Sequence, residues 1–320
     1  LSMATPEQAK QHTSSHSDSV SEESSDTARG WRRERLPEWL RMPLSKGAGS
    51  RKTAASLGER SLNTICEEAR CPNRNHCWSR GTATFLVLGE KCTRSCPFCS
   101  VAGGVPGAPD PEEPRKVAEA ALELGLKHVV VTSVNRDDLP DQGSDHFVRC
   151  INEIRSLMPD AKVEVLTPDF RGDFAAIDPI IEARPEVFNH NIETVPSLYK
   201  RVRPGARYER SLSLLERVAA ASEVSGKTRM WAKSGLMLGL GEKPEEVRSL
   251  LEDLYEVGVR IVTIGQYLQP EAQSLPVEEY IHPDQFEEWR KFGESLGFPM
   301  VFSGPFVRSS YMADAQVPLS

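Results

Sequence analysis

The stretch Ala83-Thr-Phe-Leu-Val-Leu88 is followed, after three residues, by Cys92-Thr-Arg-Ser-Cys96-Pro-Phe-Cys99. The first run is almost wholly apolar and contains Thr, Phe and Val, which are common in strands, so it predicts a strand. The second run places three cysteines at C-x3-C-x2-C spacing just after that strand. Because cysteine thiolates are the usual ligands of iron–sulfur clusters, the two runs predict a strand that leads into a cluster-binding loop.

Another group of three cysteines precedes this strand: Cys66, Cys71 and Cys77, at C-x4-C-x5-C spacing. We call this group the first trio, and the group from Cys92 to Cys99 the second trio. Three thiolates hold three irons of a four-iron cluster and leave the fourth iron open to another ligand, so we expect two clusters that act on bound molecules. The seventh cysteine, Cys150, lies in a helical pattern and is predicted to be an inert core residue.

Disulfides and zinc are the alternative uses of these cysteines. The chain shows no secretory signal and is rich in Glu and Lys, so a cytoplasmic location with reduced thiols is expected. The pair Cys96 and Cys99, together with His76 beside Cys77, leaves a zinc site open. Gaps of three, four and five residues nevertheless fit zinc ribbons poorly, so both trios favour iron–sulfur binding.

Downstream of the second trio, strand and helix patterns alternate. Asp110, Pro111 and Glu113 predict the start of a helix, and Gly125 predicts its end. Strands are expected at 83–88, 127–133, 162–167, 187–191, 228–237 and 259–264, and helices near 144–157, 173–184, 208–225 and 244–257. Alternating units imply a parallel sheet with right-handed crossovers. Six such units predict an α/β fold, a partial (β/α)6 TIM-like barrel with its site at the carboxyl ends of the strands.

Composition divides the chain into four segments. Residues 1–30 are polar and are predicted to be a disordered tail. The other segments are an N-terminal strap with the first trio (31–80), the barrel (81–270) and a C-terminal extension (271–320). A net charge of −7 argues against a general affinity for nucleic acid. No apolar run approaches the roughly 18 residues that span a bilayer, so no membrane association is expected.

The second trio has an aromatic residue, Phe98, directly before its last cysteine, and so resembles the signature of radical S-adenosylmethionine (radical SAM) enzymes. In that superfamily three cysteines hold a 4Fe–4S cluster, and the amino and carboxylate groups of SAM bind the fourth iron. The resemblance implies a partial barrel of the radical SAM type, with Phe98 near the adenine. It also implies that Asn191 and Glu193 hydrogen-bond the ribose of SAM. The alternative for this pair is a polar strand end that caps the next helix.

Further motifs narrow the resemblance to one family. The chain contains Arg136-Asp-Asp-Leu-Pro-Asp141, Thr167-Pro-Asp-Phe-Arg-Gly-Asp173, Asn189-His-Asn-Ile-Glu-Thr194, Gly265-Gln-Tyr267 and Arg308-Ser-Ser-Tyr311. With the two trios, this set is similar to the lipoyl synthases over residues 36–315. The resemblance implies a sulfurtransferase that inserts sulfur at C6 and C8 of an octanoyl chain held on a lysine of a lipoyl carrier domain. It implies SAM and two 4Fe–4S clusters, one to form a radical and one auxiliary cluster to supply sulfur.

The resemblance also assigns roles to individual residues. The expected metal ligands are Cys92, Cys96 and Cys99 for the radical SAM cluster, and Cys66, Cys71, Cys77 and Ser310 for the auxiliary cluster. Ser310 is expected to act in catalysis as the point of sulfur release, because an oxygen ligand suits iron–sulfur sites less well than a thiolate. The expected SAM-site residues are Phe98, Asn191, Glu193, Lys233, Asp137 and Asp138.

Several of these roles have alternatives. Lys233 is expected to meet the SAM carboxylate. Asp137 and Asp138 either lie at the rim of the site or cap a helix. The alternative for Ser310 is that Arg308 and Tyr311 merely dock this tail and the serines serve as caps.

The expected partners follow from the same family. They are octanoylated carrier domains of 2-oxoacid dehydrogenase E2 components and of the glycine cleavage H protein, an electron donor such as ferredoxin or flavodoxin, and a cluster-assembly carrier. Two other functions stay open. One is a methylthiotransferase with an auxiliary cluster, which needs an additional RNA- or protein-binding domain. The other is a non-catalytic zinc or iron–sulfur module, which does not account for the alternating βα units.

Overall fold

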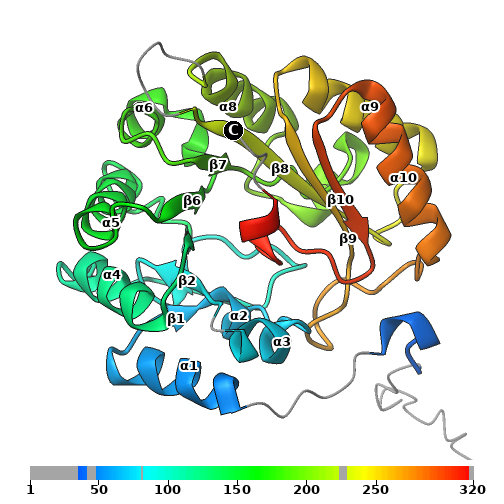
Figure 1. The fold of residues 1–320 in the computed structure, drawn as a ribbon. Coiled ribbons are helices and arrows are strands. Elements are labelled where there is room, and N and C mark those ends of the chain that lie inside the picture. Colours follow the sequence, from blue (N-terminus) through cyan, green and yellow to red (C-terminus); the bar gives the residue numbers. More distant parts are fainter. Residues whose placement is uncertain (1–34, 42–47, 81, 223–228, 317–320) are drawn as a thin grey trace, which may run out of the picture. The chain divides into compact units, whose positions relative to one another are not determined.

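Eight strands of the described chain form one sheet, in the order β1-β2-β5-β6-β7-β8-β9-β10 (Figure 1). This computed structural model describes residues 35–41, 48–80, 82–222 and 229–316. From β2 to β10 neighbouring strands pair in parallel, whereas β1 pairs with β2 in the antiparallel sense. The strands are β1 (Asn63–Thr64), β2 (Thr84–Val87), β5 (His128–Ser133), β6 (Lys162–Leu166), β7 (Val187–Asn189), β8 (Trp231–Leu238), β9 (Ile261–Gln266) and β10 (Met300–Gly304). Two short strands, β3 (Lys91–Cys92) and β4 (Ala102–Gly103), pair with each other.

Helices lie outside the arc of strands in Figure 1. The crossover helices between successive parallel strands are α4 (Glu113–Leu124), α5 (Ser144–Leu157), α6 (Phe174–Glu182), α8 (Tyr208–Ala220), α9 (Pro244–Glu256) and α10 (Pro283–Leu296). The remaining helices are η1 (Glu38–Leu40), α1 (Ala48–Glu59), α2 (Ile65–Glu68), α3 (Arg74–Ser79), η2 (Phe170–Gly172), η3 (Pro196–Leu198), α7 (Tyr199–Val202) and η4 (Ala313–Ala315). This alternation confirms the predicted partial barrel, in which β1 and β10 are the edge strands.

Helix boundaries follow local chemistry closely. The predicted helix at 144–157 is α5, and Gly125 ends α4 in the left-handed region (φ 68°), where a residue without Cβ is unstrained. The start of α4 was predicted too early. The Asp110 carboxylate accepts a hydrogen bond from the main-chain N–H of Glu112 at 2.9 Å, which stabilises a turn before the helix begins at Glu113.

A seventh parallel strand, β10, lies in the segment that the sequence predicted only as a C-terminal extension. It pairs with β9 from Met300 to Gly304, and α10 provides the crossover. Phe286 of α10 and Val301 of β10 join the main core. The predicted count of six βα units is correct, and β10 follows them as an additional strand. This strand was missed because a short strand with a single buried residue has little periodicity to recognise.

The described residues from Leu36 onward belong to one compact unit. The predicted tail at 1–30 lies outside the described residues. In the predicted strap, Leu40 is buried, and the ring of Trp39 contacts that of His282 edge-on at 4.9 Å. Within the described chain, every helix is too short or too polar to span a bilayer.

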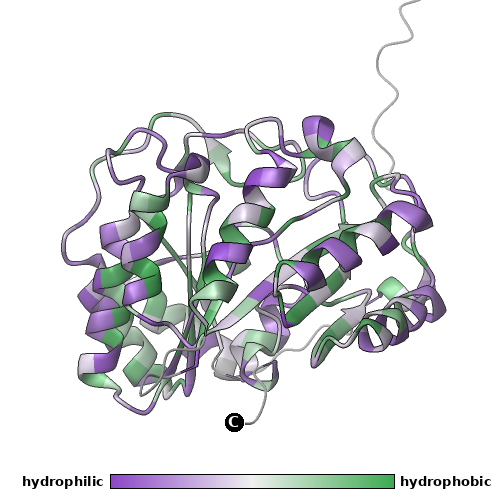
Figure 2. Cartoon of the chain, turned by 90° about the horizontal axis from the view of Figure 1, so that it is seen from above, coloured by the Kyte–Doolittle hydropathy of each residue, from purple (hydrophilic) through white to green (hydrophobic). Residues whose placement is uncertain are grey.

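The core lies between the sheet and its outer helices. On α5 the buried apolar residues are Phe147, Cys150, Ile151 and Ile154, which recur at helical spacing. Cys150 is fully buried, as predicted for a core residue. Figure 2 shows hydrophilic and hydrophobic colours side by side on the outer helices, as expected for helices with one face on a sheet.

Candidate functional site

The second trio lies just beyond the carboxyl end of β2. Cys92 ends β3, and its sulfur accepts hydrogen bonds from the main-chain N–H groups of Arg94 at 3.4 Å and Asn135 at 3.3 Å. The side-chain amide of Asn135 lies 3.7 Å from the same sulfur, and the sulfur of Cys99 accepts from the N–H of Val101 at 3.4 Å. Such N–H donors stabilise a thiolate, and donors to cluster sulfurs also tune the reduction potential.

The thiols of the second trio are close enough to affect one another. Burial, together with the charges of Cys96 and Cys92, raises the pKa of Cys99 to about 12. Burial likewise raises the pKa of Cys96. Buried sulfurs that repel one another in the thiolate form need a cationic group between them, and bound metal deprotonates a thiol outright. The donor set therefore fits an iron–sulfur cluster.

The first trio is formed by two short helices. Cys66 lies in α2 and Cys77 in α3, and the main-chain N–H of Cys71 donates to the carbonyl of Cys66 at 3.1 Å. Burial, together with the charges of Cys66 and Cys71, raises the pKa of Cys77 to about 12. The three sulfurs of this trio thus also share one buried region, which fits a second cluster.

Among the described residues, no three Cys, His, Asp or Glu side chains converge as the ligands of a single metal ion do. The thiolates of a four-iron cluster bind separate irons, so they have no need to meet at one point.

The C-terminal segment returns to the first trio, as the sequence analysis required. The side-chain amide of Asn73 donates to the carbonyl of Phe306 at 2.7 Å. The hydroxyl of Tyr311 lies 3.3 Å from Nδ1 of His76, and the two rings are 5.8 Å apart. The guanidinium of Arg308 is buried close enough to Cys71 for that thiol to influence its pKa. The contacts of Phe306 and Tyr311 therefore hold the segment that contains Arg308-Ser-Ser-Tyr311 against the trio.

Ser310 lies between these contacts and is partly buried. The C-terminal segment therefore docks at the first trio. This docking is expected both if Ser310 is a cluster ligand and if the serines are only caps. Ligation by Ser310 stays a prediction.

Ser309 joins the tail to the barrel strands. Its hydroxyl donates to the side-chain oxygen of Asn191 at 2.8 Å, and its carbonyl accepts from the ammonium of Lys233 at 2.6 Å. Lys233 lies on β8, and Asn191 lies just after the neighbouring strand β7. The sequence analysis singled out all three residues but placed none of them together, because the contacts span 76 and 118 positions.

Asn191 and Glu193 lie beyond β7, which ends at Asn189 instead of extending to Asn191 as predicted. Glu193 adopts a left-handed backbone (φ 68°) and bridges to Leu236 of β8. Burial raises the pKa of Glu193, although a hydrogen bond with Asn191 opposes the rise. The two side chains therefore meet, as the ribose-binding prediction requires. The alternative role of capping is not seen, because η3 has Val195 at its N-cap and no side-chain cap.

Asp137 and Asp138 form ion pairs with nearby arginines. Asp137 receives two hydrogen bonds from Arg94, at 2.7 and 2.8 Å, and Asp138 receives two from Arg136, at 2.9 and 2.8 Å. Neither caps α5, whose N-cap is Gly143. Of their two predicted positions, the rim of the site agrees better with these contacts.

Arg94 is a site residue that the sequence analysis missed. It lies inside the second trio, and its guanidinium lies 2.7 Å from the fully buried carboxylate of Asp169 as well as pairing with Asp137. Although burial opposes ionisation, the charge of Arg94 holds the pKa of Asp169 below its ordinary value. The pair ties the cysteine loop to the carboxyl end of β6. The sequence did contain a signal for Arg94, namely a charged residue between two cysteines of the second trio.

Lys233 has protein partners on both sides. Its ammonium lies 2.7 Å from Glu164, and both side chains are fully buried. Glu164 also pairs with His128 at 3.1 Å and accepts from Asn189 at 3.2 Å. Although burial opposes it, the charge of Lys233 holds the pKa of Glu164 below its ordinary value. The predicted contact between Lys233 and SAM stays a prediction, and the observed contacts indicate a different role.

Phe98 packs against an apolar cluster that contains Val202, Leu240 and Tyr267. The N–H of Leu275 donates to the carbonyl of Pro97 at 2.9 Å, so the loop of the second trio is also fixed to the segment after β9. An aromatic face on such a surface suits a flat adenine ring.

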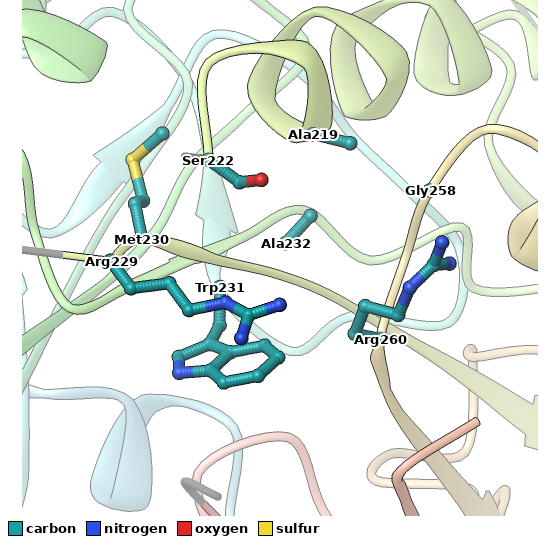
Figure 3. Close-up of a pocket in the computed structure, with 8 residues that line it drawn as sticks. All are labelled: Ala219, Ser222, Arg229, Met230, Trp231, Ala232, Gly258 and Arg260. Carbon is teal, nitrogen blue, oxygen red and sulfur yellow. The ribbon is translucent and has the colours of Figure 1, made fainter. Parts of the chain in front are cut away.

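A separate pocket lies at the opposite end of the strands (Figure 3). It is lined by Ala219, Ser222, Arg229, Met230, Trp231, Ala232, Gly258 and Arg260. Trp231 begins β8, whereas the trios and the SAM-site residues gather where parallel strands end. None of the predicted site residues lines this pocket.

Comparisons with known proteins agree with this arrangement. Residues 86–254 match the model of the radical SAM superfamily, and residues 6–71 match that of the N-terminal domain of lipoyl synthase. Curated relatives named lipoyl synthase include one from Chlorobium limicola, 54% identical over 283 residues that cover 88% of this chain and 95% of the relative. Another, from Nitratidesulfovibrio vulgaris, is 52% identical over 281 residues, covering 88% and 92% of the two chains.

Solved structures show the same fold at much lower identity. The chain is similar to Streptococcus suis SuiB bound to its precursor peptide SuiA, with a TM-score of 0.53 and 12% identity over 79% of this chain and 52% of that one. SuiB bound to S-adenosylmethionine gives a TM-score of 0.52. At this identity the similarity supports the fold alone.

Proposed function

Because this chain belongs to the lipoyl synthase family of radical SAM enzymes, we propose that it inserts sulfur at C6 and C8 of an octanoyl chain carried on a lysine of a lipoyl carrier domain. One observation supports the proposal above all. The C-terminal segment with Ser310 is held against the first trio, while Ser309 of the same segment contacts Asn191 of the predicted SAM site. The two groups of cysteines thus lie at one end of one barrel, which supports the proposal.

The chain provides ligands suited to two clusters with different tasks. When bound, SAM and one 4Fe–4S cluster supply a radical able to break an unactivated C–H bond, and a second 4Fe–4S cluster supplies the sulfur. The second trio would hold the former cluster. The first trio, with Ser310 as fourth ligand, would hold the latter. The fit rests on two groups of three thiols, in which burial and the neighbouring thiols raise the pKa of Cys77 and of Cys99.

The remaining site residues bind and orient SAM. Asn191 and Glu193, whose side chains meet, present oxygens to the ribose hydroxyls, and Phe98 faces the adenine. Asp137 and Asp138 shape the rim through their arginine partners. The buried interior of the barrel would keep water away from the radical chemistry.

The partners follow from the reaction. The protein substrates are octanoylated domains of 2-oxoacid dehydrogenase E2 components and of the glycine cleavage H protein, and the reaction takes place in the cytoplasm. An electron donor such as ferredoxin or flavodoxin reduces the radical SAM cluster. A cluster-assembly carrier replaces the auxiliary cluster after turnover.

Sulfur insertion into a model substrate tests the proposal directly. Anaerobically reconstituted protein is incubated with SAM, a reductant and an octanoyl-lysine peptide, and the peptide is analysed by mass spectrometry. The expected product contains two sulfurs, and 5′-deoxyadenosine accumulates with it. Protein that holds both clusters and cleaves SAM but leaves the peptide unchanged would contradict the proposal.

A further inference from the structure

A buried ion pair crosses the interior of the barrel. Lys233 of β8 and Glu164 of β6 are fully buried and lie 2.7 Å apart. Removing two charges from water is unfavourable, and a well-packed apolar pair often stabilises a fold as well or better. Fold stability alone is therefore a weak explanation for this pair. The other contacts of Lys233 and Glu164 indicate what further role the pair has.

The ammonium of Lys233 has one further acceptor, the main-chain carbonyl of Ser309 at 2.6 Å. Glu164 has its own additional donors in His128 and Asn189, so its charge is satisfied inside the barrel. Among the hydrogen bonds of the described residues, that from Lys233 to Ser309 connects the interior charge cluster to the C-terminal segment. A hydrogen bond from a charged donor is stronger than one between neutral groups.

The C-terminal segment lies directly on the backbone of two strands. A Cβ added to Gly265 of β9 would lie 2.1 Å from the carbonyl oxygen of Val307, and one added to Gly235 of β8 would lie 3.0 Å from the hydroxyl of Ser309. The strands thus leave room for the segment only where they have no side chain. Where the segment lies on β8 and β9, Lys233 fixes the carbonyl of Ser309 and Asn191 fixes its hydroxyl.

We propose that Lys233, neutralised by Glu164, is a positioning residue that holds the carbonyl of Ser309 and thereby fixes the next residue, Ser310, towards the first trio. The proposal rests on the proposed function in one respect, namely that Ser310 is a ligand of the auxiliary cluster. The lysine acts through the backbone, so it touches neither SAM nor the cluster. Lys233 determines how tightly the C-terminal segment is held against β8 and β9, and hence how readily Ser310 reaches iron.

Hydrogen exchange of the reconstituted holoenzyme tests the seating of the tail. The double variant Lys233→Met with Glu164→Gln removes both charges without leaving either one unpaired. We expect the amides of Val307 and Tyr311 to exchange at least about tenfold faster, as the loss of a hydrogen bond to a charged group predicts. Amides of β6 and β8 should change by less than about threefold. Equal acceleration of strand and tail amides would show a purely structural role and overturn the proposal.

Two further variants serve as controls. Glu113→Gln removes a buried carboxylate that pairs with His146 and does not touch the tail, so the tail amides should exchange at the wild-type rate. If the double variant does not fold, Lys233→Gln with Glu164→Gln replaces it, since these amides can pair with each other while the shorter side chain falls short of Ser309. The same acceleration is expected, and its absence would overturn the proposal.

A spectroscopic measurement separates this inference from the proposed function. Mössbauer spectra of 57Fe protein, with the second trio changed to alanine, report the auxiliary cluster alone. We expect the double variant at 233 and 164 to change the signal of one iron in the same direction as Ser310→Ala. If Ser310→Ala itself leaves the spectrum unchanged, the ligand role of Ser310 fails, while faster tail exchange would still support positioning by Lys233. An unchanged spectrum in the double variant alone would overturn the positioning role.

Discussion

The side-chain amide of Asn73 donates a hydrogen bond of 2.7 Å to the carbonyl of Phe306, across 233 positions of the chain. Asn73 is buried and lies between two cysteines of the first trio, Cys71 and Cys77. The peptide that holds the trio therefore also holds the start of the C-terminal segment. Residues that are far apart in the chain thus form a single structural unit around the first trio.

Asn73→Ala should loosen this unit. The change leaves the buried carbonyl of Phe306 without a donor, so the free energy of unfolding should fall by about 1–3 kcal/mol. Chemical denaturation measures this loss, and limited proteolysis should cut the tail faster. Ser79→Ala is the matched control, because Ser79 lies on the same helix but donates to His76 instead of the tail. Equal tail cleavage in both variants would contradict the linkage.

Metal content tests the presence of two sites. Each trio is expected to hold one four-iron cluster, so the anaerobically reconstituted chain should contain about eight irons. Changing either trio to alanine should leave about four irons, measured by iron and sulfide analysis. Cys150→Ala is the control, since this buried thiol lies in the core and should leave the iron content unchanged. Loss of all iron on removing one trio would mean a single shared site.

The two trios should also differ in role. The variant with the first trio changed to alanine should still cleave SAM, because the second trio and the predicted SAM residues are intact. It should make no sulfur-containing product, and chromatography of 5′-deoxyadenosine beside mass spectrometry of the peptide separates the two steps. A variant that keeps its remaining cluster yet fails to cleave SAM would refute this division.

Much of this arrangement could be predicted because the signals are local. Cysteine spacing identified both trios, and the alternation of apolar strands with capped helices identified six of the seven parallel strands. The strand β10 escaped because only Val301 is buried within it. The contacts that organise the site are not local: Lys233 meets Glu164 across 69 positions and Ser309 across 76. Such pairs become visible only when the sheet brings the strands together.

Acid should destabilise the fold through His190. Burial and the charge of Arg203 lower the pKa of this imidazole to about 4, and its neutral form donates from Nδ1 to Thr167 and accepts at Nε2 from Ser211. Below pH ~6.5 the His190 imidazole binds a proton in the unfolded chain but stays neutral in the folded chain. The free energy of unfolding therefore falls as the pH drops from about 6.5 to about 4. The loss is of the order of 3 kcal/mol.

Anaerobic urea denaturation at the two ends of this pH range measures the effect. His190→Gln should reduce the dependence on pH, because glutamine does not titrate. His282→Gln, at an exposed helix start, should leave it unchanged. If both variants keep the wild-type slope, other groups dominate the acid sensitivity.

The last prediction concerns Ser310. A cluster that gives up sulfide has to open at one iron, and a serine oxygen holds iron less firmly than a thiolate. Tyr311 and Arg308 already hold the segment at the first trio, so Ser310→Cys should keep both clusters and SAM cleavage. Sulfur insertion should nevertheless slow by at least tenfold, or about 1.4 kcal/mol in the barrier, because the iron is now bound too firmly.

Single-turnover assays, with product formation normalised to intact auxiliary cluster, measure this step. Ser303→Cys is the control, because the Ser303 hydroxyl on β10 donates to the carbonyl of Phe286 and a thiol there should not reach the iron. The auxiliary cluster of this variant should therefore release sulfur at the wild-type rate. Normal product formation by Ser310→Cys would show that sulfide leaves from an iron that this serine does not hold.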